Sequence, residues 1–336
     1  MRARKLLKGA RGNPPVRDIR PAPGMSADAI VRQMEGAGGF TGRHLAEGVG
    51  ILEEMVCRDG CLRFLSFPAC IVATGCRGIL ADMVRRRLVD VIVTTCGTID
   101  HDLARAWGRY YHGDFEMDDA SLRRMGINRL GNVLVPDRSY GTLLERRLRP
   151  MLGEIYASGL RRPSTRELIW AVGERVRDEG SILHWAARNR VPVFVPGITD
   201  GAFGCQLWMF WQEHRDFSPD PMADEQELSG LVMKAESSGA LIIGGGISKH
   251  HVIWWNQFRG GLDYAIYITT ATEQDGSLSG ARVREAISWG KVRPGARRVN
   301  IEADATAVLP LMYAALLERL EGEHSGAGRS VKSKRR

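Results

Sequence analysis

Short apolar segments alternate along the chain with longer segments in which apolar positions recur at helical spacing. Several of the short segments are apolar throughout and rich in β-branched residues, which is typical of strands covered on both faces. They are RFLSF (63–67), CIVAT (70–74), VDVIVTT (89–95), VPVFVPG (191–197), ALIIGGG (240–246), YAIYITT (264–270) and RRVNIEAD (297–304). The alternation predicts an α/β fold, a doubly wound, mostly parallel Rossmann-like sheet flanked by helices.

Charge changes this picture only at the two ends of the chain. The net charge is +8, but residues 1–20 carry seven basic side chains and one acid, and residues 324–336 carry five basic ones, which leaves −3 for residues 21–323. We predict a flexible, proline-rich basic arm (1–24), a single α/β domain (25–323) and a disordered basic tail (324–336). Such tails solubilise a protein or contact RNA or an acidic partner.

Membrane and metal chemistry have little support in the sequence. No apolar run approaches the roughly 20 residues that span a bilayer, and the basic N-terminus lacks an apolar signal core. A cytoplasmic protein is therefore expected. The six cysteines include no C-x-x-C pair, so we predict neither a zinc site nor a redox dithiol, and no metal.

Small and polar residues follow the predicted strands, where ligands of open α/β sheets bind. Asp200 and Asp304 stand at strand ends and suit ribose hydroxyls, although a turn or a helix N-cap explains them equally well. LIIGGGISKHH resembles a dinucleotide fingerprint, but Lys249 stands at the third glycine position. We therefore expect a ligand that carries phosphate and ribose, with only weak support from the glycines alone.

The segment SGARVREAISWGKVR (279–293) predicts a short helix that ends on Trp289, Gly290 and Lys291. A left-handed glycine followed by a cation is a common helix C-cap. His250 and His251 are adjacent on another predicted helix and project about 100° apart, so at most one of them faces a pocket.

Taken in order, VDVIVTT, GINRLGNVLVP, VPVFVPGITDG, LIIGGGISKHH, LDYAIYITTATEQDGSLSGAR, EAISWGKVR and DATAVLPL resemble the deoxyhypusine synthase family, particularly its archaeal branch, over about residues 35–315. The resemblance implies an NAD-dependent transferase. It would move the aminobutyl group of spermidine to one lysine of the initiation factor five-A precursor, through an imine on an enzyme lysine. It also implies a homotetramer with active sites at dimer interfaces.

The resemblance also assigns roles to residues. Lys291 is the implied nucleophile, for which apolar cover from Trp289 would favour the neutral amine, and His250 is the candidate for proton transfer. The positions that match cofactor contacts are Thr95, Gly97, Asp200, Gly276, Ser277, Asp304 and Ala305. The positions that match the polyamine pocket are Tyr267, Thr270, Ser279, Glu285 and Trp289.

Departures from the family pattern leave the substrate open. Eukaryotic members carry acidic residues where this chain has His101, Cys205 and Leu278, although Asp100, Asp102 and Glu285 remain nearby in the sequence. A homospermidine synthase-like transfer to putrescine is one alternative. The other is a non-catalytic protein that binds nucleic acid through its basic tails.

Overall fold

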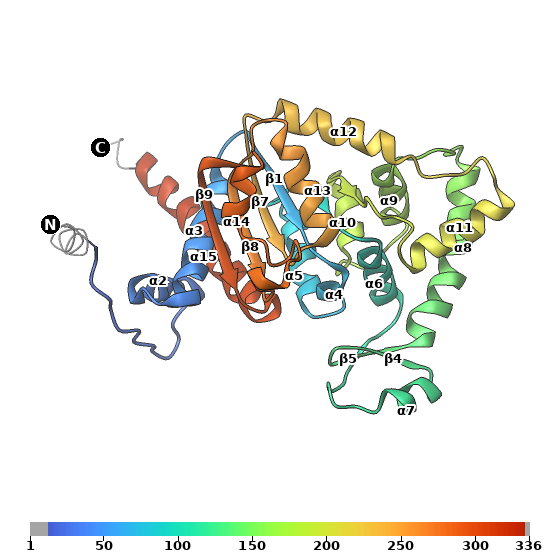
Figure 1. Ribbon diagram of the computed structural model, residues 1–336, viewed down its shortest axis with the longest axis horizontal. Coiled ribbons are helices and arrows are strands. Elements are labelled where there is room, and N and C mark those ends of the chain that lie inside the picture. The colour runs from blue at the N-terminus through green and yellow to red at the C-terminus, as the bar shows by residue number, and fades with distance from the viewer. Residues whose placement is uncertain (1–12, 333–336) are drawn as a thin grey trace.

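The computed structural model describes residues 13–332, of which 323–332 are described through their backbone alone. Its centre is a six-stranded sheet of parallel strands in the order β6-β2-β1-β7-β8-β9, with helices on both faces (Figure 1). The strands are β1 (Cys61–Ser66), β2 (Val91–Val93), β6 (Val193–Phe194), β7 (Ser237–Ile243), β8 (Leu262–Thr269) and β9 (Val292–Glu302). The predicted doubly wound parallel sheet is confirmed.

Helices make up most of the remaining chain. They are α2 (Ala27–Ala37), α3 (Phe40–Cys57), α4 (Ala69–Val72), α5 (Cys76–Arg85), α6 (Cys96–Trp107), α7 (Asp119–Arg124), α8 (Gly141–Ala157), α9 (Thr165–Gly173), α10 (Ile182–Asn189), α11 (Ala202–Glu213), α12 (Pro221–Lys234), α13 (Gly246–Gln257), α14 (Val283–Ser288) and α15 (Ala305–Lys332). Two short 3₁₀ helices are η1 (Asp137–Ser139) and η2 (Glu273–Asp275).

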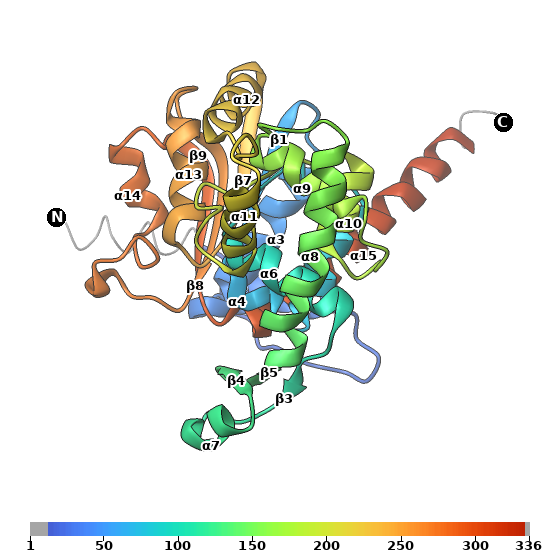
Figure 2. The same ribbon diagram turned by 90° about the vertical axis from the view of Figure 1, so that its right-hand side faces the viewer.

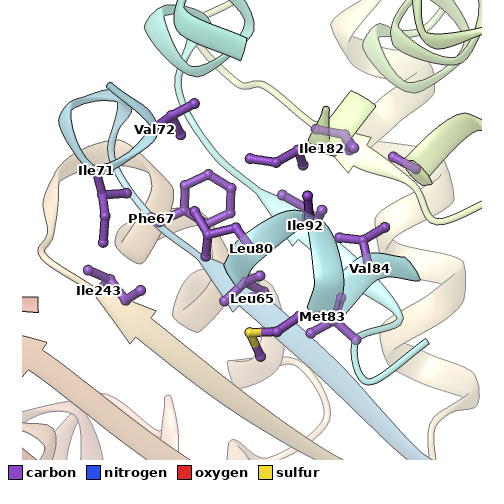
Figure 3. Packing of buried hydrophobic residues seen from close by; sticks show 14 of the residues in the cluster. Leu65, Phe67, Ile71, Val72, Leu80, Met83, Val84, Ile92, Ile182 and Ile243 are labelled. Carbon is purple, nitrogen blue, oxygen red and sulfur yellow. The ribbon is translucent and has the colours of Figure 1, made fainter. Parts of the chain in front are cut away.

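The two faces of the sheet bury different side chains because successive strand residues point to opposite sides. On β8, Ile266 and Ile268 pack into the larger core, which α3, α5, α10 and α15 cover. Tyr267 points the other way, toward α12, α13 and α14. Figure 3 shows the larger core, where Leu65 and Ile92 of the sheet pack against Leu80 of α5. The α13 and α14 side of the sheet is where the candidate catalytic residues gather.

A second, antiparallel sheet projects from the body of the molecule together with α7 (Figures 1 and 2). Its strands are β3 (Tyr111–His112), β4 (Ile127–Leu130) and β5 (Val133–Pro136). Gly131, with φ of 61°, opens the turn of the β4–β5 hairpin, a conformation that favours glycine. We did not predict this sheet, because its strands have at most four residues and are only partly buried.

One strand prediction is wrong. CIVAT forms α4 and the turn after it, whereas each of the other apolar segments contains a strand of the large sheet. Pro68 precedes α4 in an extended conformation, and the amide of Ala73 donates to the carbonyl of Cys70, which closes a helical turn. A short apolar run suits a buried helical turn as well as a buried strand, so its composition could not decide between them.

The ends of the chain differ from the expectation in one respect. Residues 13–24 form neither helix nor strand, and the amide of Arg17 donates to Gly36 at the end of α2. Helix α15 continues to Lys332, so residues 324–332 are helical where we expected a disordered tail. Once a helix exists, each added residue gains a hydrogen bond without a new nucleation cost. Residues 1–12 and 333–336 lie outside the described residues, and the division into one domain with tails stays a prediction.

Candidate active site

The end of α14 holds Lys291 in a fixed place. Gly290 has φ of 67°, its amide donates to the carbonyl of Ile287, and the amide of Lys291 donates to Ala286 at 2.9 Å. This pair of hydrogen bonds is a Schellman motif, so the predicted left-handed glycine cap is confirmed. The carbonyl of Lys291 then accepts from the amide of Leu262 at 3.0 Å, which ties the lysine to the first residue of β8.

The side chain of Lys291 enters a cavity of about 170 Å³ between α13 and α14, over the face of β8. We call it the lysine cavity; its lining includes Lys249, Tyr267, Leu278, Glu285, Trp289 and Lys291. Lys291 is only 8% exposed, and its Nζ lies 5.2 Å from the ring centroid of Trp289 and 5.8 Å from that of Trp254. Two indole rings therefore flank the amine, although Trp289 itself is 66% exposed.

Tyr267 gives the lysine cavity an unsatisfied hydroxyl. The residue is 1% exposed, and its hydroxyl has no hydrogen-bond partner among the described residues. Burial, together with the Glu285 carboxylate, raises the pKa of Tyr267, so the hydroxyl keeps its proton. Buried polar groups are nearly always paired, and an unpaired one that lines a cavity is available to a ligand.

Lys249 is a second lysine in the same cavity, and the sequence analysis gave it no role. Its Nζ donates to the carbonyls of Leu278 and Ala281 at 2.7 and 2.8 Å, and lies 4.1 Å from the ring centroid of Tyr267. Burial lowers the pKa of Lys249 to about 8, against the opposing effect of the Glu285 carboxylate. It thus ties α13 to the loop that precedes α14.

A sequence signal for Lys249 did exist. It shares the buried stripe of α13 with Val252, Ile253 and Asn256, at offsets of three, four and seven residues. A lysine is almost never fully buried unless it is paired, so its place in this stripe marks it as special.

The two adjacent histidines separate as predicted. His250 is exposed beside Trp254, with ring centroids 5.7 Å apart, and partial burial and the charge of Lys291 lower its pKa. His251 turns toward Glu225 of α12, at 3.6 Å, and burial lowers its pKa to about 4. Only His250 therefore lies near Lys291, and it stands outside the lining of the lysine cavity.

A larger cavity of about 620 Å³ lies outside the carboxyl ends of the strands, and we call it the strand-end cavity. Thr270, Ser279, Asp304 and Ala305 are among the residues that line it. Gly245 lies beside it, where a Cβ would fall 2.2 Å from the hydroxyl oxygen of Ser279, so only glycine permits this approach. Leu278 lines the lysine cavity and the next residue, Ser279, lines the strand-end cavity. The two cavities therefore lie on either side of one loop.

Asp304 serves as a helix cap and also faces the strand-end cavity. Its Oδ1 accepts from the amide of Thr306 at 2.7 Å and from the hydroxyl of the same residue. Its Oδ2 has no partner within residues 13–322. The structure is therefore compatible with both predicted roles of Asp304, the helix cap and the ribose contact, because capping uses one carboxylate oxygen and leaves the other available.

Five predicted cofactor positions line neither cavity. Thr95 and Gly97 follow β2. Asp200 follows β6, the strand that pairs with β2, and its side chain is exposed. Gly276 and Ser277 lie on the exposed part of the loop before α14, where the amide and hydroxyl of Ser277 both donate to Asp275. Their roles stay predictions.

The acidic residues near His101 have structural partners. Asp100 accepts from the amides of Ala202 and Phe203 and from the hydroxyl of Tyr140. Asp102 accepts from Arg77 and Ser181. Glu285 is therefore the carboxylate available to an ammonium group in the lysine cavity.

The positions that depart from the family pattern are dispersed. His101 forms a hydrogen bond with the hydroxyl of Tyr110, and burial and Arg105 lower its pKa to about 4. Cys205 is exposed, and Leu278 lines the lysine cavity.

The described residues form neither a membrane-spanning helix nor a metal-binding cluster. No helix in this part of the chain is long and apolar enough to cross a membrane. Within the same residues, no group of three or more His, Cys, Asp or Glu side chains is arranged to hold a metal ion.

Comparisons of the sequence with known proteins agree over most of its length. The profile of the deoxyhypusine synthase family matches residues 29–316. A probable deoxyhypusine synthase of Thermoplasma volcanium is 52% identical over 303 residues, which cover 90% of this chain and 97% of that protein. Another, of Ignicoccus hospitalis, is 50% identical over 312 residues, covering 91% and 97%.

A solved structure shares the fold. A protein described as a deoxyhypusine synthase from Entamoeba histolytica superposes with a TM-score of 0.63 at 19% identity, covering 89% of this chain and 96% of that one. At this identity the similarity speaks for the architecture alone.

Proposed function

The chain belongs to the deoxyhypusine synthase family, in its archaeal branch, and is a transferase of that type; we propose that it moves the aminobutyl group of spermidine, with NAD, to one lysine of the initiation factor five-A precursor. The observation that carries the proposal is the amine of Lys291, nearly buried between two indole rings and facing a cavity with an unpaired hydroxyl. We place the reaction in the cytoplasm.

Lys291 is the nucleophile in this proposal. A lysine attacks a carbonyl or imine carbon through its free amine. Attack of Lys291 on the oxidised carbon releases 1,3-diaminopropane, and the covalent imine then retains the aminobutyl fragment until the acceptor lysine displaces Lys291 from it. Arginine cannot replace this group, because its guanidinium does not lose its proton in proteins.

The walls of the lysine cavity suit a short cationic chain. The face of Trp289, which lines the cavity, and that of Trp254, which lies near the amine of Lys291, can hold methylene groups or an ammonium. Glu285 can pair with an ammonium, and the hydroxyl of Tyr267 can donate to or accept from an amine. His250, which its lowered pKa keeps neutral near pH 7, can accept a proton at the mouth.

The strand-end cavity is the proposed cofactor site. NAD bound there would accept hydride from the butyl carbon attached to the secondary nitrogen of spermidine, and would return it to the final imine on the acceptor lysine. The free Oδ2 of Asp304 can accept hydrogen bonds from ribose hydroxyls, and Thr270, Ser279 and Ala305 line the same space. We assign Thr95, Gly97, Asp200, Gly276 and Ser277 to the same cofactor.

We also propose a homotetramer whose active sites lie at dimer interfaces. Two large apolar side chains are exposed close to the lysine cavity, Trp254 on α13 and Phe258 directly after that helix. A second copy that covers this face would bury them and exclude water from Lys291. Sedimentation should then give four chains per particle, and Phe258→Glu should lower both assembly and activity.

The decisive assay separates three acceptors. The purified protein is incubated with NAD and spermidine labelled in its aminobutyl group, together with the factor precursor, with putrescine, or with neither. Label on the precursor protein supports the proposal. Label recovered in homospermidine with none on the precursor would instead show transfer to putrescine, and the absence of any spermidine oxidation would contradict the enzymatic function.

A further inference from the structure

A cavity of about 710 Å³ lies between the C-terminal end of α6, helix α8 and the connection from α9 to α10. Both ribbon views place α6 beside α8 (Figures 1 and 2). The charged residues that line it are Arg105, Arg109, Arg147, Arg175, Arg177 and Asp178. We call it the arginine pocket; it shares no lining residue with the lysine cavity or the strand-end cavity.

The positive charge in this pocket is largely uncompensated. Asp178 already pairs with Arg77 at 2.8 Å, outside the lining, and Arg175 pairs with Glu154 at 3.1 Å. Arg109, Arg147 and Arg177 are exposed and form no ion pair or side-chain hydrogen bond with any residue in the range 13–322. Three free guanidinium groups therefore converge on one concavity.

The net charge of the domain does not explain this cluster of arginines. Residues 21–323 carry a net charge of −3, since the basic excess of the chain lies in its two ends. Like charges held close together repel each other and favour an anion between them. An anionic ligand would remove that repulsion.

Arg105 forms the fixed wall of the pocket. Its Nη1 donates to the carbonyls of Val72 and Thr74, which holds the guanidinium in place. Its Nε and Nη2 have no hydrogen-bond partner in the described part of the chain. Burial and the neighbouring charge of Arg77 lower its pKa, although arginine keeps its proton in proteins. Two donor groups are thus oriented before any ligand arrives.

We propose that the arginine pocket binds an oligophosphate anion, either free or as the phosphate chain of a nucleotide. Guanidinium groups donate pairs of parallel hydrogen bonds to phosphate oxygens, and several of them at different angles suit a chain of phosphates better than a single carboxylate. The volume lies within the range of small-molecule sites, about 300–1,000 Å³.

The test uses the full-length protein and calorimetric titration with inorganic tripolyphosphate at low and high salt. Parallel titrations with ATP and with orthophosphate distinguish a nucleotide from a free phosphate chain. The test variant is Arg147→Gln/Arg177→Gln. The control is Arg146→Gln, which removes one positive charge, against two in the test variant, from the adjacent exposed position of α8, outside the pocket lining.

Tripolyphosphate should bind the wild type with an affinity that falls as salt rises. The double variant should bind at least about tenfold more weakly, as expected for lost charge-assisted hydrogen bonds, and Arg146→Gln should stay within about twofold. ATP binding tighter than that of tripolyphosphate identifies the nucleotide source, and ATP binding no tighter than that of tripolyphosphate identifies the free phosphate chain. Equal affinities in the double variant and the control would overturn the assignment. So would binding of a short RNA without binding of tripolyphosphate.

Unchanged melting temperatures and unchanged aminobutyl transfer in both variants check that the fold is intact.

Discussion

Single residues of the site carry two structural roles at once, and Asp304 is the clearest case. One carboxylate oxygen caps α15, and the residue lines the strand-end cavity. From the sequence, a cap and a ribose contact were equally good interpretations, because both place a short carboxylate just before a helix. The structure confirms the cap, and the ribose contact stays a prediction.

Asp304→Ala should weaken NAD binding by about 1.5–3 kcal/mol, the range for a hydrogen bond to a charged group. Asp304→Asn keeps an oxygen that can cap the helix, so it should retain the melting temperature while losing part of the affinity. Calorimetric titration with NAD measures both variants. An affinity unchanged in Asp304→Ala would refute the cofactor contact.

The buried amine of Lys249 should make stability depend on pH. Its pKa falls from 10.5 to about 8 in the folded protein, so between these values the unfolded chain holds more protons. The folded state therefore gains stability from this group as the pH rises through that window, and the contribution is constant below it. Compared with Lys249→Met, the wild type should gain about 3 kcal/mol of unfolding free energy from about pH 7 to about pH 10.

Urea denaturation of both proteins across this pH range measures the difference directly. Subtracting the variant removes the titration of all other groups that the two proteins share. A difference that does not change with pH would mean that Lys249 titrates near its ordinary pKa, and that burial does not govern it.

At the scale of elements, the position of Lys291 depends on the turn that ends α14. Gly290 has φ of 67°, and a Cβ added there would meet no atom within 4 Å. Gly290→Ala should therefore destabilise the protein through backbone strain alone, by about 1–2 kcal/mol. It should also slow transfer, because the strain can move Lys291.

A glycine without a positive φ provides the control for this interpretation of the turn. Gly295 lies in β9 with no atom within 4 Å of an added Cβ and without a positive φ. Gly295→Ala should leave thermal unfolding and transfer near the wild-type values. Equal effects of the two substitutions would show that the left-handed turn has no special importance.

The sequence predicted elements well where a pattern repeats and poorly where tertiary contacts decide. The apolar segment YAIYITT was long enough to identify the strand β8, but CIVAT was too short to separate a strand from α4. The β4–β5 hairpin lies away from the main core, so its residues are only partly buried and show no strong alternation.

At the scale of the whole molecule, the candidate site combines α13, β8 and α14, which meet only in the folded chain. The family motifs identified Lys291, but the missing partner of Tyr267 and the two carbonyl partners of Lys249 follow from packing that no local pattern encodes. The sequence predicted a ligand site only at the carboxyl ends of the strands and did not locate the lysine cavity. The strand-end cavity lies where parallel sheets bind ligands, whereas the lysine cavity lies between helices over the sheet face.

The N-terminal arm should have little influence on the chemistry at Lys291. Its described part, residues 13–24, precedes α2 in the chain and contacts the end of that helix. Helix α2 packs on α3 and α15, on the sheet face opposite α13 and α14. Deleting residues 1–20 should leave NAD-dependent spermidine oxidation within a few-fold of the wild type. It should slow transfer to the protein acceptor most at low salt, where screening is weakest. A large rise in oxidation would show instead that the arm covers an active site.

The central claim is that Lys291 carries the aminobutyl group, and borohydride trapping tests it most directly. Wild-type protein incubated with NAD and labelled spermidine and then reduced should retain one label per active site, on the peptide that contains Lys291. Lys291→Ala and Lys291→Arg should fold and bind NAD nearly as the wild type does, and should retain no label. A covalent adduct of equal yield on Lys291→Ala would contradict the account.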